Sequence, residues 1–189
     1  MPITYDTVDK TTDDLIKRAM AMYHSELAGA GVTVHAVFAS NIDKETGEIC
    51  PAVKVHGHTA AAKMQVTSLQ DRARGLPDAK LTIDEYSWKR MAESRRVALI
   101  DHELEHLVLK TDDDGIVFDD RGRPKLKLKI HDWQFQGFAK IIERHGEAAV
   151  EHREMVRWQE KGGQYSLFPL VGTKEVPNGK DVSSEAADA

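Results

Sequence analysis

The stretch that decides the fold reads Ala98-Leu99-Ile100-Asp101-His102-Glu103-Leu104-Glu105-His106-Leu107 and contains the pattern His-Glu-x-x-His. Side chains four residues apart lie on one face of a helix, so His102 and His106 can present two imidazoles to a single metal ion. Zinc held by neutral nitrogens keeps an open position for water and lowers the pKa of that water to about 7. Glu103 follows the first histidine directly, which sets its carboxylate beside the ion as a general base. The pattern therefore predicts a zinc site.

The residues around this pattern favour a half-buried helix. There is no Gly or Pro from 93 to 109. Apolar residues recur along the stretch at a spacing of three and four: Val97, Ile100, Leu104, Leu107 and Val108. The same pattern also occurs by chance on charged helices, where both histidines are simply solvated. A buried stripe beside the histidines makes the metal site the better interpretation.

Length and composition indicate a globular domain with an extension. The chain has 189 residues, of which 41% are hydrophobic and 30% charged, enough for a core of its own. Cys50 is the only cysteine, so no internal disulfide or thiolate metal cluster is expected. The start of the chain lacks a charged leader with an apolar run, and no segment approaches the ~18 apolar residues needed to cross a bilayer. We expect a cytoplasmic protein without membrane contact.

The order of periodic segments predicts an α+β fold with a small mixed sheet, a helix carrying the His-Glu-x-x-His pattern, a β-hairpin and C-terminal helices. Residues 80–83 are expected to form a strand, and one strand that runs past the motif helix is expected to bind a peptide backbone by strand addition. After the motif, residues 116–118 and 125–130 predict the hairpin. Its second arm alternates, so Leu126, Leu128 and Ile130 should face inward and three lysines outward.

The hairpin also carries the concentrated basic run of the sequence. The net charge of −5 argues against wrapping nucleic acid with the whole surface, yet a local basic patch is compatible with it. Residues 121–129 predict either a local contact with DNA or lysines that keep an edge strand soluble. The cations of this run are Arg121, Arg123, Lys125, Lys127 and Lys129.

The last part of the chain is expected to hold two helices and a tail. Asp132 is expected to cap a helix that stops near Gly146, and a second helix is expected from 147 to 159. From 162 to 189 the composition shifts to Gly, Pro, Ser, Asp and Ala. We therefore expect a domain over residues 1–161 and a flexible tail over residues 162–189.

A catalytic zinc site needs a third protein ligand, and three alternatives are open. Asp112 lies ten residues past His102, where metzincins place their last ligand, but Leu109 occupies the position of the glycine that those enzymes need. Glu143 and Glu147 resemble the helix-borne ligand of thermolysin, although nothing in their spacing singles them out. His131 lies where a strand ends and a helix begins, and we favour it because that junction can aim a side chain at the motif helix.

Candidates for the group that polarises a substrate carbonyl are weaker. His56 and His58 flank a glycine, which could line a site or form an ordinary exposed loop, and the loop is the preferred interpretation. Tyr86 is the third candidate for stabilising an oxyanion.

Several runs together carry a resemblance to a known family. They are residues 98–106, Gly122-Arg123-Pro124-Lys125-Leu126-Lys127-Leu128, His131-Asp132-Trp133, Arg144-His145-Gly146, Ala60-Ala61-Ala62-Lys63 and Asp71-Arg72-Ala73-Arg74-Gly75. Over about Gly31 to Gly146 the chain resembles the putative phage metallopeptidase family, which is regarded as a minimal zincin and is similar in style to SprT-like proteases. The resemblance implies zinc, peptide-bond hydrolysis, His102, His106 and His131 as ligands, Glu103 as base, and a bacterial host cell.

The tail contains a short motif, Gln164-Tyr165-Ser166-Leu167-Phe168, that resembles the pentapeptide with which bacterial proteins dock on the replicative sliding clamp. Gln164, Ser166, Leu167 and Phe168 match, whereas Tyr165 replaces a leucine. A flexible segment can place Leu167 and Phe168 in an apolar pocket, or the two side chains can fold back onto their own domain.

The combined hypothesis is a zinc metallopeptidase tethered to the clamp and acting on DNA-associated proteins. One alternative is a non-catalytic binding module that zinc stabilises and that occupies the clamp or another partner. The other alternative is a narrow regulatory peptidase unrelated to DNA.

Overall fold

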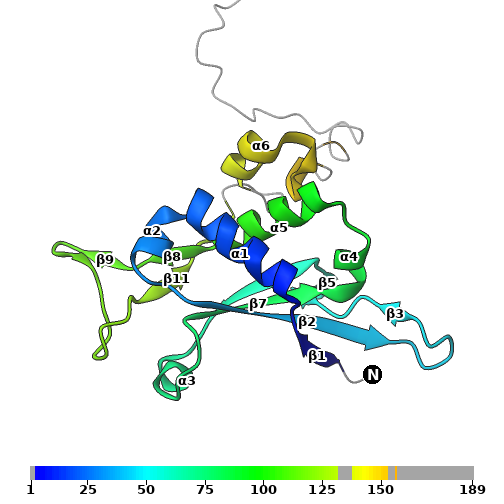
Figure 1. Cartoon of the computed structure of the whole chain (residues 1–189), viewed down its shortest axis with the longest axis horizontal. Helices are drawn as coiled ribbons and strands as arrows, with labels where there is room; N and C mark the ends of the chain where they lie inside the picture. The colour runs from blue at the N-terminus through cyan, green and yellow to red at the C-terminus, as the bar shows by residue number, and fades with distance from the viewer. Residues whose placement is uncertain (1–2, 132–137, 153–155, 157–189) are drawn as a thin grey trace, which may run out of the picture.

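The computed structural model of the chain describes residues 3–131, 138–152 and 156 (Figure 1). The tail predicted for residues 162–189, with its clamp-like motif at Gln164, Ser166, Leu167 and Phe168, lies outside the described residues.

A small mixed sheet forms the base of the molecule. Its strands run in the order β1-β2-β7-β6, and β3 pairs with the far part of β2. The central pair β2 and β7 is parallel, whereas β1, β3 and β6 are antiparallel to their neighbours. The bounds are β1 Thr4–Thr7, β2 Val34–Ile42, β3 Ile49–Cys50, β6 Ala62–Val66 and β7 Ala79–Asp84. The α+β fold with a small mixed sheet is confirmed.

The long helices cover one face of this sheet (Figure 1). They are α1 Lys10–Tyr23, with the short α2 Ser25–Gly29 after it, and α5 Glu93–Glu105, which carries the motif. Asp9 caps α1 by accepting a hydrogen bond from the Thr12 amide. Apolar side chains of α1, α5 and the sheet form the main core: Leu15, Ile16, Ala19, Met64, Leu81, Ile83, Leu99, Ile100 and Leu104. Burial of this stripe fixes which face of α5 points inward.

The motif helix ends earlier than the apolar spacing predicts. α5 stops at Glu105, and residues Leu107–Leu109 form strand β8, which pairs antiparallel with β11 Leu126–Leu128. The prediction of helical Leu107 and Val108 is wrong, because backbone pairing with β11 competes successfully with the last helical turn. This change of direction at His106 brings the residues after β11 next to the motif.

The hairpin also differs in detail from the prediction. β10 Gly115–Ile116 pairs with β9 Thr111–Asp112 instead of with the second arm. Residues 116–118 meet the start of that arm at a hydrogen bond from the Lys125 amide to the Val117 carbonyl, next to a Phe118–Pro124 bridge. Leu126 is buried in the core, but Leu128 is 49% exposed and Ile130 is 85% exposed. The prediction that Leu128 and Ile130 face inward is wrong. The β8–β11 ribbon extends past the sheet, and nothing in the described chain covers it there.

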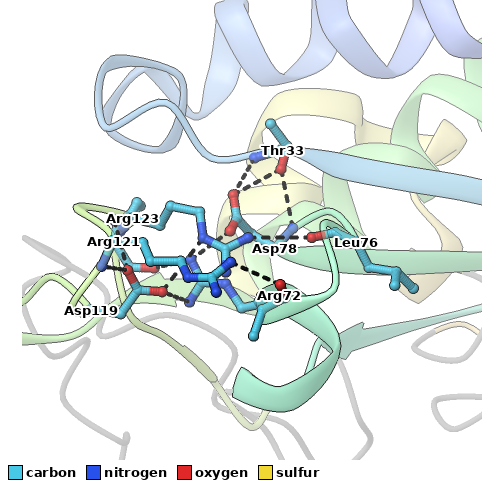
Figure 2. Close-up of polar contacts among 9 residues, drawn as sticks. Thr33, Arg72, Leu76, Asp78, Asp119, Arg121 and Arg123 are labelled. Carbon is cyan, nitrogen blue, oxygen red and sulfur yellow. Dashed lines mark hydrogen bonds and ion pairs between the residues drawn. The ribbon is translucent and has the colours of Figure 1, made fainter.

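A buried arginine links the loop before β11 to the sheet (Figure 2). Arg72 of α3 Leu69–Ala73 is 2% exposed and donates to Asp78 Oδ1 at 2.5 Å and to the Pro124 carbonyl at 3.0 Å. The other carboxylate oxygen of Asp78 accepts hydrogen bonds from the Thr33 amide and hydroxyl. The residue before β2, the turn before β7 and the loop before β11 are thereby linked through the Arg72–Asp78 ion pair.

Replacing this arginine should destabilise the protein. We expect Arg72→Met to lower the free energy of unfolding by about 3 kcal/mol, because it removes one partner of a buried ion pair and leaves the Asp78 carboxylate poorly compensated. Urea unfolding followed by circular dichroism measures the change. Arg74→Met is the matched control, since Arg74 is exposed and its ion pair with Asp71 lies at the surface. A loss for Arg72→Met no larger than for this control would contradict the assignment.

The helix after the ribbon is shorter than expected. α6 Ala139–His145 begins after Phe138, whose backbone is extended, so Asp132 is not its N-cap. The predicted stop near Gly146 is confirmed, and Gly146 has φ +53°. A 3-10 turn, Gly146–Ala148, follows, and residues 150–152 and 156 are helical within the range predicted for the second helix.

The remaining elements are small. α4 Glu85–Lys89 leads from β7 to α5, and β4 Lys54–Val55 pairs with β5 His58–Thr59 in a tight turn. Across the part of the chain that the structure describes, no helix has the length and apolar character needed to span a membrane.

Candidate metal centre

The end of α5 presents the first two imidazoles of the site. His102 lies in the last turn of the helix, and His106 is its C-terminal cap with helical backbone angles, φ −67° and ψ −24°. The i, i+4 geometry therefore persists although the helix formally ends at Glu105. Their ring centroids are 5.2 Å apart.

Strand β11 brings the third imidazole to the same place. The Lys129 amide donates to the His106 carbonyl at 2.7 Å, and the Lys129 carbonyl accepts from His106 Nδ1 at 2.8 Å. This pair of bonds extends the β8–β11 ribbon to the motif helix. His131 comes two residues later, and its ring centroid lies 4.6 Å from that of His106. The predicted convergence of a strand end on the motif helix is confirmed.

The three histidines are close enough to share one ion. One ring nitrogen from each of His102, His106 and His131 lies within 4.8 Å of the other two. His102 Nε2 and His131 Nε2 are 3.2 Å apart. Two nitrogens that each lie about 2.05 Å from a tetrahedral zinc are about 3.3 Å apart, so this spacing fits such an ion. Neutral imidazoles are also among the ligands that zinc prefers.

Hydrogen bonds at the opposite ring nitrogens turn two of the imidazoles toward the centre. A carbonyl oxygen can only accept a hydrogen bond, so His106 Nδ1 must carry a proton and donate it to the Lys129 carbonyl. His106 Nε2 therefore keeps a free lone pair in the neutral ring. Similarly, His102 Nδ1 bonds the Glu151 carboxylate at 2.5 Å, and Glu151 is 3% exposed. Such outer partners fix the tautomer and orientation of metal-binding histidines.

An aromatic ring covers the cluster. Phe138 is fully buried, and its ring centroid lies 5.1, 4.9 and 5.0 Å from the rings of His102, His106 and His131. The Phe138 amide also donates to Glu151 Oε1 at 3.3 Å. The segment that begins α6 therefore both shields one side of the histidines from water and helps to hold the carboxylate that orients His102.

Glu103 has the environment of a proton acceptor. Its side chain is 5% exposed, and burial raises its pKa to about 7, with a further upward effect from Glu151. His102 and a hydrogen bond with the Met64 backbone act in the opposite direction. Burial also lowers the pKa of His106, which favours the neutral form that binds metals. A base with a pKa near neutrality suits proton transfer at physiological pH.

A third buried carboxylate, Asp101, precedes His102 in the motif helix. Asp101 is fully buried and binds His24 Nε2 at 2.7 Å, Arg144 Nη1 at 2.8 Å and His145 Nε2 at 2.7 Å. Although burial by itself raises the pKa of Asp101, the hydrogen bonds from His24 and His145 and the charge of Arg144 bring it below its ordinary value. This Asp101 cluster joins the end of α1 and α6 to the motif helix.

The other ligand candidates lie elsewhere on the surface. Asp112 is exposed on β9, and Glu143 and Glu147 are exposed on and after α6. His56 and His58 are exposed in the β4–β5 turn, in agreement with the preferred interpretation as a loop. Tyr86 is stacked under the Arg90 guanidinium at 3.7 Å.

Most of the basic run at 121–129 is engaged within the protein. Arg121 donates to the Ala73 carbonyl and Arg123 pairs with Asp119 (Figure 2). Lys129 pairs with Glu105 and lies 5.0 Å from the centre of the Phe138 ring. These contacts favour the structural interpretation of this run.

Sequence reasoning did not identify Glu151, Phe138 or the Asp101 cluster as parts of the site. All three act across large sequence separations, and nothing in the local pattern marks them. A carboxylate that follows the motif on a later helix is the one signal that could have drawn attention to Glu151.

A family model described as "Putative phage metallopeptidase" matches residues 5–160. The chain belongs to this family. Comparisons with curated proteins and with solved structures gave no match. Membership in the phage metallopeptidase family and the three converging histidines together indicate a metal-dependent peptidase.

For this phage metallopeptidase, the Glu151 contact makes a testable prediction. Glu151→Gln keeps the size of the side chain but removes the charge that orients His102, so we expect metal affinity to fall by about 10–100-fold. Competition with a zinc-binding dye measures that affinity. Glu147→Gln, a change at an exposed position nearby, is the control and should leave it unchanged. Equal affinity in the Glu151 variant and the wild type would show that the contact does not support the site.

Proposed function

We propose that the protein is a zinc metallopeptidase in which His102, His106 and His131 are the metal ligands and Glu103 is the general base. The observation that carries the proposal is the convergence of three imidazoles, two of them oriented by hydrogen bonds at Nδ1, beside a buried glutamate. A zinc ion in such a site supplies a Lewis acid that polarises a carbonyl and lowers the pKa of water to about 7.

The protein's own groups have separate roles in this proposal. Glu103 takes a proton from the attacking water and passes it to the leaving amine. Glu151 and the Lys129 carbonyl keep two imidazoles in the tautomer that leaves Nε2 unprotonated. Phe138 keeps water from one side of the cluster, which strengthens the electrostatic interactions inside it.

Strand β6 is the proposed binding edge for the peptide substrate. It ends the sheet, whereas β7, which contains the predicted strand 80–83, has a neighbour on both sides and offers no free edge. A hydrogen bond joins the Met64 backbone of β6 to Glu103, so the outer edge of this strand runs past the proposed base. A substrate strand paired with β6 would bring its backbone to the histidines.

The test is cleavage that depends on the metal. Unfolded casein incubated with the purified protein should yield new peptide termini detectable by mass spectrometry. Chelation should stop their formation, and zinc added back should restore it. Cleavage that persists unchanged after complete removal of the metal would contradict the proposal.

We further propose that this peptidase is tethered to the sliding clamp, a proposal that rests on the sequence motif alone. Gln164, Ser166, Leu167 and Phe168 would dock on the bacterial sliding clamp and bring the enzyme to DNA-associated proteins. A clamp pull-down with intact protein and with Leu167→Ala/Phe168→Ala decides it. Equal retention of the two proteins would remove the tether from the proposal.

A further inference from the structure

The sheet has a second face, away from α1 and α5, that carries a groove of about 440 Å³. Along β6 and β7 the residues alternate, and Met64 and Leu81 belong to the core under the helices. Their neighbours Lys63 and Lys80 therefore point to the opposite face. The groove lies on this face and is lined by Tyr5, Asn41, Lys54, Lys63, Gln65 and Lys80, among others. None of the candidate metal ligands lines it.

The charge of this groove is opposite to that of the chain. The whole sequence has a net charge of −5, yet the residues that line the groove include three lysines and no carboxylate. Within the described part of the chain, no ion pair engages Lys54, Lys63 or Lys80. Three ammonium groups without local compensation form a site for a polyanion.

The direction of the groove argues against a peptide as its occupant. It crosses the sheet from Tyr5 on β1 to Lys63 on β6, over three strand spacings, or about 14 Å. The strands β2 and β7 beneath it are already paired on both sides, so strand addition is impossible there. Recognition must come from side chains that point out of the sheet.

Those side chains include groups suited to bases as well as to phosphates. Tyr5 is 59% exposed and offers a ring on which a base can stack. Asn41 also lines the groove and brings a side-chain amide to its wall. A second hollow of about 310 Å³ shares Gln65 and Lys80 with the groove, but its lining also includes the Asp71 carboxylate of α3, so the proposed site is confined to the groove itself.

We propose that this cationic groove binds single-stranded nucleic acid, with Lys54, Lys63 and Lys80 on successive phosphates and Tyr5 against a base. A sheet surface with lysines and an exposed aromatic side chain is a common platform for unpaired strands. This activity is separate from the proposed peptidase chemistry, because the groove and the histidine cluster share no residue.

The experiment is fluorescence anisotropy with a labelled 12-nucleotide oligothymidylate and the full-length protein. If three phosphates are neutralised, the dissociation constant should rise about 18-fold between 50 and 200 mM salt. Lys63→Ala/Lys80→Ala should bind more weakly than wild type at 50 mM salt, and its constant should rise only about 2.6-fold over the same range. Tyr5→Ala should weaken binding at both salt concentrations.

The matched control is Lys125→Ala/Lys127→Ala, which removes two lysines of the basic run at 121–129 and should bind as wild type does. Circular dichroism establishes that each variant is folded. The proposal is overturned if the wild type does not bind the oligonucleotide, if both double variants lose binding equally, or if an unlabelled 12-residue polyglutamate displaces the oligonucleotide at lower concentration than unlabelled oligothymidylate does.

Discussion

Glu103→Gln is expected to lower kcat/KM for peptide cleavage by about 10²–10⁴-fold while the metal content of the protein stays at the wild-type level. The amide keeps the size of the side chain but cannot accept the proton of the attacking water. Glu103 is buried beside His102 but is not one of the three residues that could hold the ion, so the metal site should still assemble. Steady-state cleavage of a fluorogenic peptide, together with metal analysis of the same sample, measures both quantities.

Glu93→Gln is the control for this experiment. Glu93 lies in the first turn of the same helix and is exposed, so its replacement should change neither cleavage nor metal content. Unaltered cleavage by the Glu103 variant would exclude its role as base. Retained biological activity of that variant would instead favour the non-catalytic binding module.

Asp101→Ala is expected to lower the free energy of unfolding by about 4–5 kcal/mol. The substitution leaves His24, Arg144 and His145 without the buried carboxylate that each of them contacts. Removing one member of a buried charged network strongly destabilises a protein, because the other members lose compensation but stay out of water. Urea unfolding of the chelated protein measures the effect without the contribution of metal binding.

Asp113→Ala provides the comparison, since Asp113 is exposed in the β9–β10 turn and should change stability by less than about 0.5 kcal/mol. If the Asp101 and Asp113 variants unfold at the same urea concentration, the cluster does not hold α6 to the motif helix. The segment with Phe138 and Glu151 would then need another anchor.

The sequence predicted those parts of the site that local spacing encodes. His102 and His106 follow from one helical turn, and the place of His131 follows from a strand that returns to the motif helix. The end of α5 could not be predicted in the same way, because Leu107 and Val108 fit a helical stripe and a strand equally well. Pairing with Leu126–Leu128 decides between the two, and that pairing spans an intervening loop.

The groups around the histidines were missed for a related reason. Glu151 lies 49 residues after His102, and His24 lies 77 residues before Asp101. No periodic pattern connects residues so far apart, so only the folded chain shows these contacts. For the basic run, adjacent charges left two interpretations open, and the contacts of Arg121, Arg123 and Lys129 with other parts of the chain favour the structural one.

Metal analysis of the purified protein after exposure to zinc and removal of the excess tests the central claim most directly. We predict one zinc ion per chain for the wild type and for Asp112→Ala, and almost none for His131→Ala, because only the third histidine completes the set of ligands. Circular dichroism verifies that the His131 variant is folded. A metal-free wild type, or full zinc occupancy in the His131 variant, would contradict a three-histidine zinc site.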